Sequence, residues 1–323
     1  MDYPTLVGPP PRHKFLPSGT VLDERFRIDG LVGRGGMATV YRATHLALGK
    51  QVAVKVPSHV HDEPRFQREA RSLARVEHPN VCRIFDVGES AGRPFLVMEL
   101  LAGQTVAGKL MQGALPIREA LEIARRVLEA LTAVHEAGLV HRDVKPANVM
   151  ITEPDSCVKL LDFGLAKSSS PAEAITDVTS TGVVVGTPQY MSPEAMRGRP
   201  LDARSDVYSV GTLLFHMLAG ELPFEGEPPL LYLRVARGEH RNLADVGSAV
   251  PLEVQEIVAR ALAPEPDRRF PSASSFRRAI VLSDAYMEPD TRVQEIVPRA
   301  LDFDSVTQLY TPDDERALRS STR

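Results

Sequence analysis

Two short runs of apolar, β-branched residues, at 52–56 and 95–98, stand out early in the chain. Their length and composition are typical of buried strands. Between them, residues 65–76 place apolar side chains at helical spacing along one face. We therefore expect a sheet-rich segment from about residue 26 to residue 98 that contains one helix.

The pattern changes to helical spacing after Gly103. From residue 117 to residue 131 the apolar positions recur every three or four residues, and Pro116 suits the first turn of the predicted helix. A sheet-rich part followed by a helix-rich part predicts two lobes separated by a cleft, the usual place for a small ligand. Further helices are expected at 202–219, 251–262 and 272–283.

Composition and charge narrow the class of protein. The 323 residues are 43% hydrophobic and 25% charged, the balance of a soluble globular protein. A net charge of −4 gives no reason to expect nucleic acid or an acidic membrane as a partner. Cys82 and Cys157 form no CxxC pattern, so neither zinc nor a disulfide is expected, and free thiols suit a reducing cytoplasm. We expect no membrane span and no signal segment.

The two ends differ from the middle. Residues 1–20 contain five prolines and are expected to form a flexible, extended arm. Residues 286–323 are polar, and we expect a largely disordered tail in which only 293–301 could form a short helix. The tail could dock a partner or inhibit the cleft, but a solvated linker is the simpler interpretation. One folded domain is predicted at 21–285, with lobes at about 26–101 and 102–285.

Candidate chemistry is densest at residues 141–148, which read His-Arg-Asp-Val-Lys-Pro-Ala-Asn. Asp143 could take a proton from a hydroxyl, Lys145 could neutralise a phosphate, and Asn148 could hold a divalent metal. These are the groups that transfer of a phosphoryl group requires. The segment therefore predicts a catalytic loop, if the rest of the chain supplies a nucleotide site.

A glycine-rich turn at residues 33–40 reads Gly-Arg-Gly-Gly-Met-Ala-Thr-Val. Glycines let backbone N–H groups approach phosphate oxygens. The turn alone is weak evidence, since a plain hairpin would use the same residues and Ala38 stands where a third glycine is expected. Two strand-like runs follow, not the helix that a dinucleotide-binding turn needs, which favours a cover over nucleotide phosphates.

Two charged residues are placed by apolar runs: Lys55 lies within one, and Asp162 follows another. Lys55 lies in the run at 52–56, where an unpaired ammonium is costly to bury, and Glu69 on the following helix is the expected partner. A lysine that reaches solvent is the alternative. Asp162 opens Asp-Phe-Gly, 14 residues beyond Asn148, and the two could share Mg²⁺, which prefers carboxylate and amide oxygens. An ordinary aspartate turn is the alternative here.

The order of these motifs is more specific than any one of them. After Asp162 come Gly-Thr-Pro-Gln-Tyr-Met-Ser-Pro-Glu at 186–194 and Asp-Val-Tyr-Ser-Val-Gly at 206–211. In this order the chain resembles a bacterial eukaryotic-like (Hanks-type) Ser/Thr protein kinase over about residues 26–283. The resemblance implies an α+β, two-lobed protein-kinase-like fold, with a small β-rich N-lobe containing one helix and a larger, mainly α-helical C-lobe.

The resemblance also implies catalytic roles. Asp143 would orient or deprotonate the substrate hydroxyl, and Thr187 would bridge to Asp143. Lys145 would contact the transferring phosphate. Lys55 would hold the α- and β-phosphates of ATP and pair with Glu69.

Metal-binding and structural roles follow in the same way. Asn148 and Asp162 would bind Mg²⁺. Asp206 would brace the catalytic loop through backbone N–H groups. Glu194 would form a structural ion pair with Arg269.

The adenine slot that the resemblance implies has apolar walls and a backbone hinge. Val40, Ala53 and Met150 would form the walls, although the same side chains would serve as ordinary core. The backbone of Glu99 and Leu101 would supply hinge hydrogen bonds. The complete set of implied ATP-binding residues is Val32, Gly33, Arg34, Gly35, Gly36, Met37, Ala38, Thr39, Val40, Ala53, Lys55, Met98 as gatekeeper, Glu99, Leu101 and Met150.

Regulation is expected at Arg142, whose charge next to Asp143 is poorly compensated unless an anion approaches. The segment at 165–185 is rich in Ser and Thr, and the resemblance points to Thr179 and Thr181 as autophosphorylation sites. A phosphate there would bind Arg142. The alternative is that these hydroxyls merely solvate a loop.

The predicted activity is ATP-dependent transfer of the γ-phosphate to Ser or Thr hydroxyls of protein substrates, with ATP and Mg²⁺ (or Mn²⁺) as cofactors. A transient homodimer would allow autophosphorylation in trans. Two other functions stay open. Small-molecule phosphotransferases resemble the nucleotide site but generally lack the segment at 186–194, which in protein kinases receives a peptide. An ATP-binding scaffold is suggested only by Ala38, while the departure at Ser192 is mild.

Overall fold

The computed structural model describes residues 15–35, 38–58, 63–163, 188–246 and 250–287. The chain divides into two compact units, Met1–Tyr286 and Met287–Arg323. The elements described below belong to the first unit, except for the last residue of the final helix. The predicted domain at 21–285 lies within this unit.

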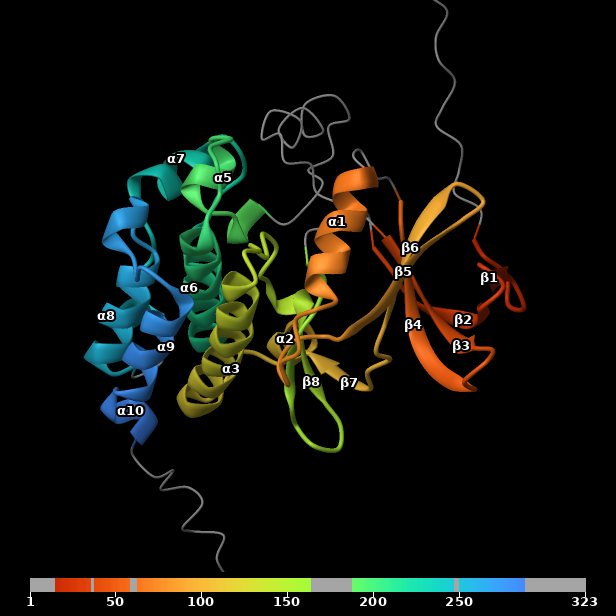
Figure 1. Cartoon of the computed structure of the whole chain (residues 1–323). Helices are drawn as coiled ribbons and strands as arrows, with labels where there is room; N and C mark the ends of the chain where they lie inside the picture. Colours follow the sequence, from red (N-terminus) through yellow and green to blue (C-terminus); the bar gives the residue numbers. More distant parts are fainter. Residues whose placement is uncertain (1–14, 36–37, 59–62, 164–187, 247–249, 288–323) are drawn as a thin grey trace, which may run out of the picture. The chain divides into compact units, whose positions relative to one another are not determined.

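Six antiparallel strands form the sheet of the N-lobe (Figure 1). Their order across the sheet is β1-β2-β3-β4-β6-β5. The glycine-rich turn joins strands β2 and β3, so the predicted strand–turn–strand order is confirmed. The strands are β1 (Val21–Leu22), β2 (Phe26–Arg34), β3 (Ala38–His45), β4 (Lys50–Pro57), β5 (Ile84–Ser90) and β6 (Arg93–Met98).

One face of this sheet closes over its own hydrophobic core. Phe26 and Phe95 meet edge to face there, with ring centroids 6.0 Å apart. Val52 and Val54 of β4 point into this core. Because side chains alternate along a strand, the residues between and after them, beginning with Ala53, point to the opposite face. The complete core set is Leu22, Phe26, Ile28, Tyr41, Ala43, Val52, Val54, Phe95 and Val97.

Helix α1 (Glu63–Leu73) is the predicted helix of the N-lobe. Phe66, Ala70 and Leu73 are buried at spacings of four and three residues, which gives one apolar face. The helix ends at Leu73, earlier than the expected residue 76, and Val76 is buried in the turn that follows, where its N–H donates to the Leu73 carbonyl.

A second, three-stranded sheet carries residues 149–160. Its strands are β7 (Gly103–Thr105), β8 (Val149–Thr152) and β9 (Val158–Leu160). Gly103 has φ of 146°, and a Cβ there would lie 2.1 Å from the Ile151 carbonyl oxygen, so the close approach of β7 to β8 requires glycine. The sequence pattern did not predict this sheet.

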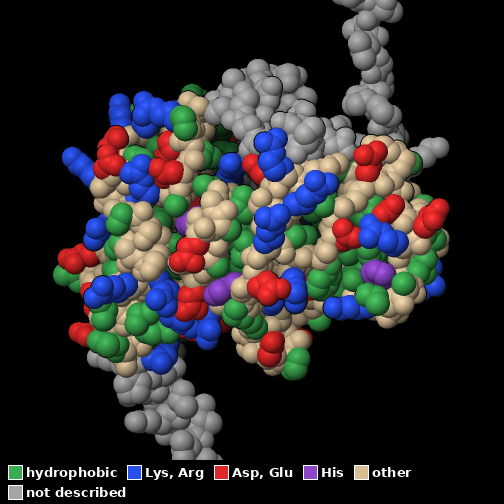
Figure 2. All heavy atoms as spheres, in the orientation of Figure 1, with side chains coloured by type: hydrophobic (Ala, Val, Ile, Leu, Met, Phe, Trp, Pro, Cys, Tyr) green, Lys and Arg blue, Asp and Glu red, His purple; other side chains and the backbone are tan. Residues whose placement is uncertain are grey.

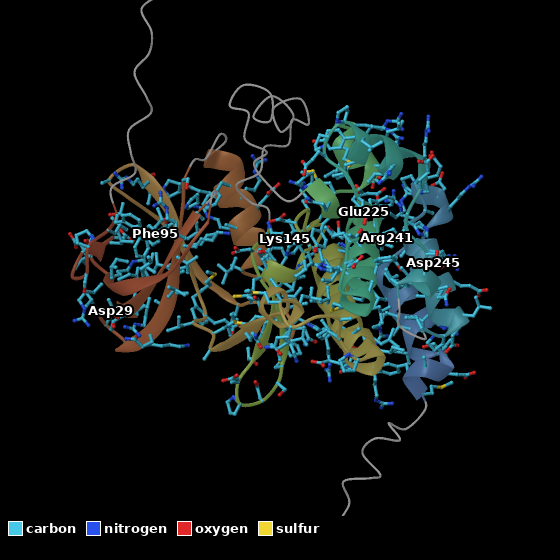
Figure 3. All side chains as sticks on the ribbon, turned by 180° about the vertical axis from the view of Figure 1, so that it is seen from behind. Asp29, Phe95, Lys145, Glu225, Arg241 and Asp245 are labelled. Carbon is cyan, nitrogen blue, oxygen red and sulfur yellow. The ribbon has the colours of Figure 1, made fainter. Side chains whose placement is uncertain are left out.

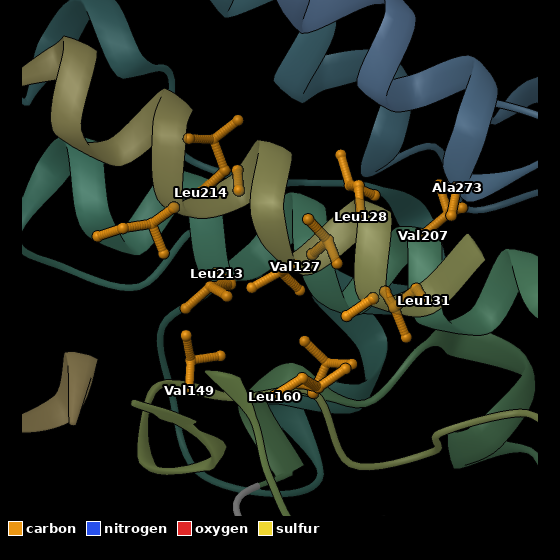
Figure 4. Close-up of a cluster of buried hydrophobic side chains, with 14 of the residues drawn as sticks. Val127, Leu128, Leu131, Val149, Leu160, Val207, Leu213, Leu214 and Ala273 are labelled. Atoms are coloured by element: carbon orange, nitrogen blue, oxygen red, sulfur yellow. The ribbon is translucent and has the colours of Figure 1, made fainter. Parts of the chain in front are cut away.

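The C-lobe is built around helix α6 (Ala203–Ala219), which is buried along most of its length. Figure 4 shows Val127, Leu128 and Leu131 of α3 in one apolar cluster with Val207, Leu213 and Leu214 of α6 and with Val149 and Leu160 of the second sheet. The other helices are α2 (Val106–Leu110), α3 (Ile117–Glu136), α5 (Pro193–Met196), α7 (Leu230–Arg237), α8 (Leu252–Ala261), α9 (Ala273–Val281) and α10 (Asp284–Met287).

The predicted C-lobe helices are confirmed as α3, α6, α8 and α9. One detail differs: Pro116 occupies the N-cap position of α3, with an extended ψ of 140°, and the first helical residue is Ile117. Proline has no N–H to lose at such a position. Among the described residues, no helix has both the length and the apolar character needed to cross a membrane.

The last helix is tied to α3 by Tyr286. Its hydroxyl donates to Glu122 Oε2 at 2.6 Å, and its carbonyl accepts from Arg118 at 3.2 Å. The Glu253 carboxylate accepts the backbone N–H groups of Asp284 and Ala285 at the start of α10. On the face drawn in Figure 2, acidic and basic side chains are interspersed.

Candidate active site

The buried carboxylate of Asp206, in the first turn of α6, organises the loop that begins at His141. The N–H groups of His141 and Arg142 donate to its two oxygens at 2.8 and 2.9 Å. These bonds hold Arg142 at φ of 66°, a conformation that costs energy for any residue except glycine. The predicted bracing by Asp206 is confirmed. His135, whose Nε2 lies 2.8 Å from Asp206 Oδ2, is a partner that the sequence did not reveal.

His141 links this loop to the strand that precedes Asp162. Its Nδ1 accepts the N–H of Asp143 at 3.2 Å, so Nε2 carries the proton and donates to the Leu161 carbonyl at 2.9 Å. The ring packs on Phe163 with centroids 4.5 Å apart. One imidazole therefore holds the backbone of the loop at Asp143 together with Leu161 and Phe163, on either side of Asp162.

Asp143, Lys145 and Asn148 meet around one carboxylate. Lys145 Nζ donates to Asp143 Oδ2 at 2.9 Å, and Asn148 Nδ2 donates to the same oxygen at 2.9 Å and to the Asp143 carbonyl at 2.8 Å. The amide nitrogen of Asn148 is thereby used within the loop, so its Oδ1 is the atom suited to a cation. Lys145 is labelled in Figure 3, between the strands and the helical region.

Asp162 is brought to Asn148 by the backbone. The Leu161 N–H donates to the Asn148 carbonyl at 2.8 Å, and Asp162 follows at φ of 51°. An amide oxygen and a carboxylate form a donor set that suits Mg²⁺, which takes its other ligands from phosphates and water. The two residues predicted to hold the metal therefore suit that ion chemically, and the Leu161–Asn148 hydrogen bond brings their backbones together.

The ion pairs of Lys55 and Glu69 differ from the sequence prediction. Lys55 Nζ lies 2.8 Å from Asp162 Oδ1, whereas Glu69 was the expected partner. Glu69 Oε1 lies 3.4 Å from an Arg142 nitrogen. Asp162 has a left-handed backbone, and its carboxylate gives Lys55 a partner that no sequence spacing indicated.

Strand register places four predicted nucleotide-site residues on one face of the N-lobe sheet. Val40 is paired with Lys55 across β3 and β4, and Ala53 is paired with Met98 across β4 and β6. Residues directly opposite each other share a face, and Ala53 and Lys55 are two residues apart on one strand. Val40, Ala53, Lys55 and Met98 therefore lie opposite the N-lobe core. Met150 lies on β8 of the second sheet.

The turn between β2 and β3 is closed by the Gly35 N–H, which donates to the Ala38 carbonyl at 2.9 Å. Val32, Gly33 and Arg34 are the last residues of β2, and Ala38 and Thr39 begin β3. Some predicted residues lie outside the described part of the chain: Gly36, Met37, Thr179, Thr181 and Thr187.

The hinge is anchored by the side chain of Glu99, which the sequence prediction missed. Glu99 Oε1 accepts from the Arg83 N–H at 2.7 Å and from Lys159 Nζ at 2.9 Å. The Glu99 N–H donates to the Arg83 carbonyl, so the Glu99 carbonyl is the backbone group suited to a ligand. Leu101, the other predicted hinge residue, is half-buried.

Glu194 in α5 and Arg269 form a buried, bidentate ion pair, as predicted. The two Glu194 oxygens each lie 2.8 Å from an Arg269 nitrogen. The Ser205 hydroxyl donates to Glu194 at 2.7 Å, and the Arg269 side chain is fully buried. Burial alone would raise the pKa of Glu194, but the hydrogen bonds and charge of Arg269 outweigh it and the pKa is lowered.

The family model of the protein kinase domain matches residues 26–279. The chain belongs to the protein kinase family. This kinase is 43% identical to the serine/threonine-protein kinase PksC of Streptomyces coelicolor over 78% of this chain and 48% of the relative. It is 41% identical to PknL of Mycobacterium tuberculosis over 78% of this chain and 64% of the relative. The kinase therefore spans roughly a quarter to two thirds of the length of these and similar curated relatives.

Solved structures agree with the kinase fold. The crystal structure of the M. tuberculosis PknI kinase domain superimposes with a TM-score of 0.67 at 28% identity, covering 83% of this chain and 98% of that one. The β-rich N-lobe and helical C-lobe expected from the sequence are thus those of the family.

Proposed function

We propose that this protein is an active serine/threonine protein kinase that transfers the γ-phosphate of ATP to protein hydroxyls. The observation that carries the proposal is the cluster at Asp143, where Lys145 and Asn148 converge on one carboxylate beside the Asp162–Lys55 pair. Asp143 supplies a base, Lys145 and Lys55 supply two cations, and Asn148 and Asp162 supply two metal ligands. Phosphoryl transfer is mostly positioning and charge neutralisation, so this set suffices.

Each residue has a role that its contacts support. Asp143 accepts the proton of the substrate hydroxyl, and Lys145, already 2.9 Å from it, neutralises charge on the phosphate being transferred. Lys55 holds the other phosphates of ATP, and Val40 and Ala53 pack on the adenine from the sheet face they share with it. Bound Mg²⁺, held by Asn148 and Asp162, would neutralise the phosphate charge; Mn²⁺ would serve the same donor set.

We also propose that phosphorylation at Thr179, Thr181 or both activates the enzyme. Arg142 is the expected receiver because its pair with Glu69 is long, at 3.4 Å, so a doubly charged phosphate would compete successfully with Glu69 for the guanidinium. The reaction would proceed in trans in a transient homodimer. The two free cysteines support a reducing, cytoplasmic setting.

Incubation of the purified protein with labelled Mg-ATP and a generic protein substrate tests the activity. We expect label on serine and threonine after acid hydrolysis, and near-complete loss with Asp143→Asn. The control Asp267→Asn changes an exposed aspartate far along the chain and is expected to keep full transfer. Transfer by the Asp143→Asn protein at the wild-type rate would refute the catalytic assignment.

The same assay separates the other functions. Label on a small molecule but not on protein would indicate a small-molecule phosphotransferase. ATP binding without turnover would indicate a scaffold. Mass spectrometry of the active protein with neither Thr179 nor Thr181 modified would contradict the activation proposal.

A further inference from the structure

The short helical turn η2 (Pro188–Tyr190) is attached to α6 at two points, both through Tyr190. Its carbonyl accepts from the Ser209 hydroxyl at 2.9 Å, and its own hydroxyl lies 2.5 Å from His216 Nδ1. Ser209 and His216 are seven residues apart, so they lie on one face of the helix, about 10 Å apart along its axis. Two attachments at that separation fix both the position and the direction of the Tyr190 side chain.

The hydroxyl–imidazole contact is partly buried and joins two neutral groups. Burial lowers the pKa of His216 and raises the pKa of Tyr190, so at neutral pH the phenol keeps its proton and the imidazole is uncharged. In the His216 tautomer that is protonated on Nε2, the Tyr190 O–H donates to Nδ1. The carboxylates of Asp206 on α6 and of Glu194 on α5 are engaged by His135 and Arg269.

The residues beside Tyr190 add little to this attachment. The Gln189 side-chain oxygen is buried and has no hydrogen-bond partner among the described residues. Met191 N–H only closes the turn, by donating to the Pro188 carbonyl at 3.0 Å. The hydrogen bonds that attach η2 to α6 therefore both come from Tyr190. The one made by its side chain requires His216.

We propose that His216 is a positioning residue for the protein substrate, which acts through the Tyr190 hydroxyl on the turn that receives the peptide. This rests on the proposed function and on the family resemblance, by which the segment at 186–194 receives the peptide; the structure describes residues 188–194 of that segment. His216 itself does not touch the substrate. The ATP site is held by separate contacts, those of Lys55, Asp143 and Asp206, so loss of the His216 contact should weaken peptide binding and spare ATP binding.

Steady-state kinetics on the full chain, with a protein substrate and ATP varied separately, tests this proposal. We expect Tyr190→Phe and His216→Leu each to raise the KM for protein about tenfold, the change that loss of one buried hydrogen bond predicts. The KM for ATP should change less than twofold. His216→Asn should restore most of the loss, because an asparagine side-chain atom can occupy the Nδ1 position as an acceptor.

A matched control is Tyr208→Phe on the same helix. Its hydroxyl is also buried but has no hydrogen-bond partner among the described residues, so its removal should leave both KM values unchanged. A wild-type KM for protein in Tyr190→Phe, with or without a lower melting temperature, overturns the proposal, as does a failure of His216→Asn to differ from His216→Leu. Absence of transfer by the wild-type protein overturns the proposed function itself, and this inference with it.

Discussion

Removal of the charge on Glu194 is expected to destabilise the C-lobe strongly. The Arg269 guanidinium is fully buried and bonds both Glu194 oxygens at 2.8 Å. Its remaining N–H groups donate to the carbonyls of Ala263, Pro264 and Arg204, so it cannot turn toward water. In Glu194→Gln the guanidinium keeps these bonds but loses its counter-charge. In Arg269→Met the carboxylate is left buried without a counter-charge, with hydrogen bonds from the Ser205 hydroxyl and from its own backbone N–H.

The size of the effect follows from burial. Loss of one partner of a buried pair costs about 3–5 kcal/mol, because the remaining charge stays away from water. In a domain of this size each kcal/mol lowers the melting temperature by about 2–4 °C, so we expect a drop of roughly 6–20 °C. Glu194→Gln should fall near the lower limit because the amide keeps the shape and one acceptor.

The dependence on pH has a definite sign. The folded pKa of Glu194 is lowered from its ordinary value of 4.5, so its stabilising contribution is complete above that value. The contribution is lost as the pH falls through the lower, folded pKa. The difference in stability between wild type and Glu194→Gln should therefore shrink as the pH falls below 4.5.

Thermal and urea unfolding, followed by circular dichroism at pH 7.5, measure these values. Glu239→Gln is the control, because its pair with Arg237 is exposed and 3.4 Å long, and it should cost less than about 1 kcal/mol. A melting temperature for Glu194→Gln within 1 °C of wild type would refute the argument that this pair is both buried and coupled to folding.

Three further predictions concern Tyr286, the two cysteines and His216. Tyr286→Phe removes a hydrogen bond to the Glu122 carboxylate and should lower stability by about 1 kcal/mol in urea unfolding, with activity unchanged. A thiol reagent should modify Cys157 in the native protein and Cys82 only after unfolding, because burial raises the pKa of Cys82 to about 12; two fast native thiols would contradict this. The lowered pKa of His216 adds stability above pH 6.5 that is lost as pH falls through its folded pKa, and His216→Asn should flatten this part of the unfolding profile.

Motif order alone was enough to predict the family, both lobes and two long-range contacts. The contacts of Asp206 with the loop at His141 and of Glu194 with Arg269 were foreseen because family motifs fix both partners. Long helices such as α3 were foreseen because a 20-residue apolar stripe has an unambiguous period.

Other features depend on geometry that no periodicity records. The partner of Lys55 is Asp162, which lies 107 residues away in the chain, and the spacing of side chains along the sequence does not indicate such a contact. His216 lies within an apolar helical run, where the sequence indicates only a buried position, and its partner Tyr190 is 26 residues earlier. Strands as short as β7 offer too few residues for an alternating pattern.

The anchoring of α10 on α3 sets the shortest version of this kinase domain that should fold intact. The family match ends at residue 279, yet Tyr286 is the residue that bonds Glu122 and accepts from Arg118. A chain cut at 279 would leave the Glu253 carboxylate without the N–H groups of Asp284 and Ala285. For expression of a minimal domain, the C-terminal boundary therefore belongs after Tyr286.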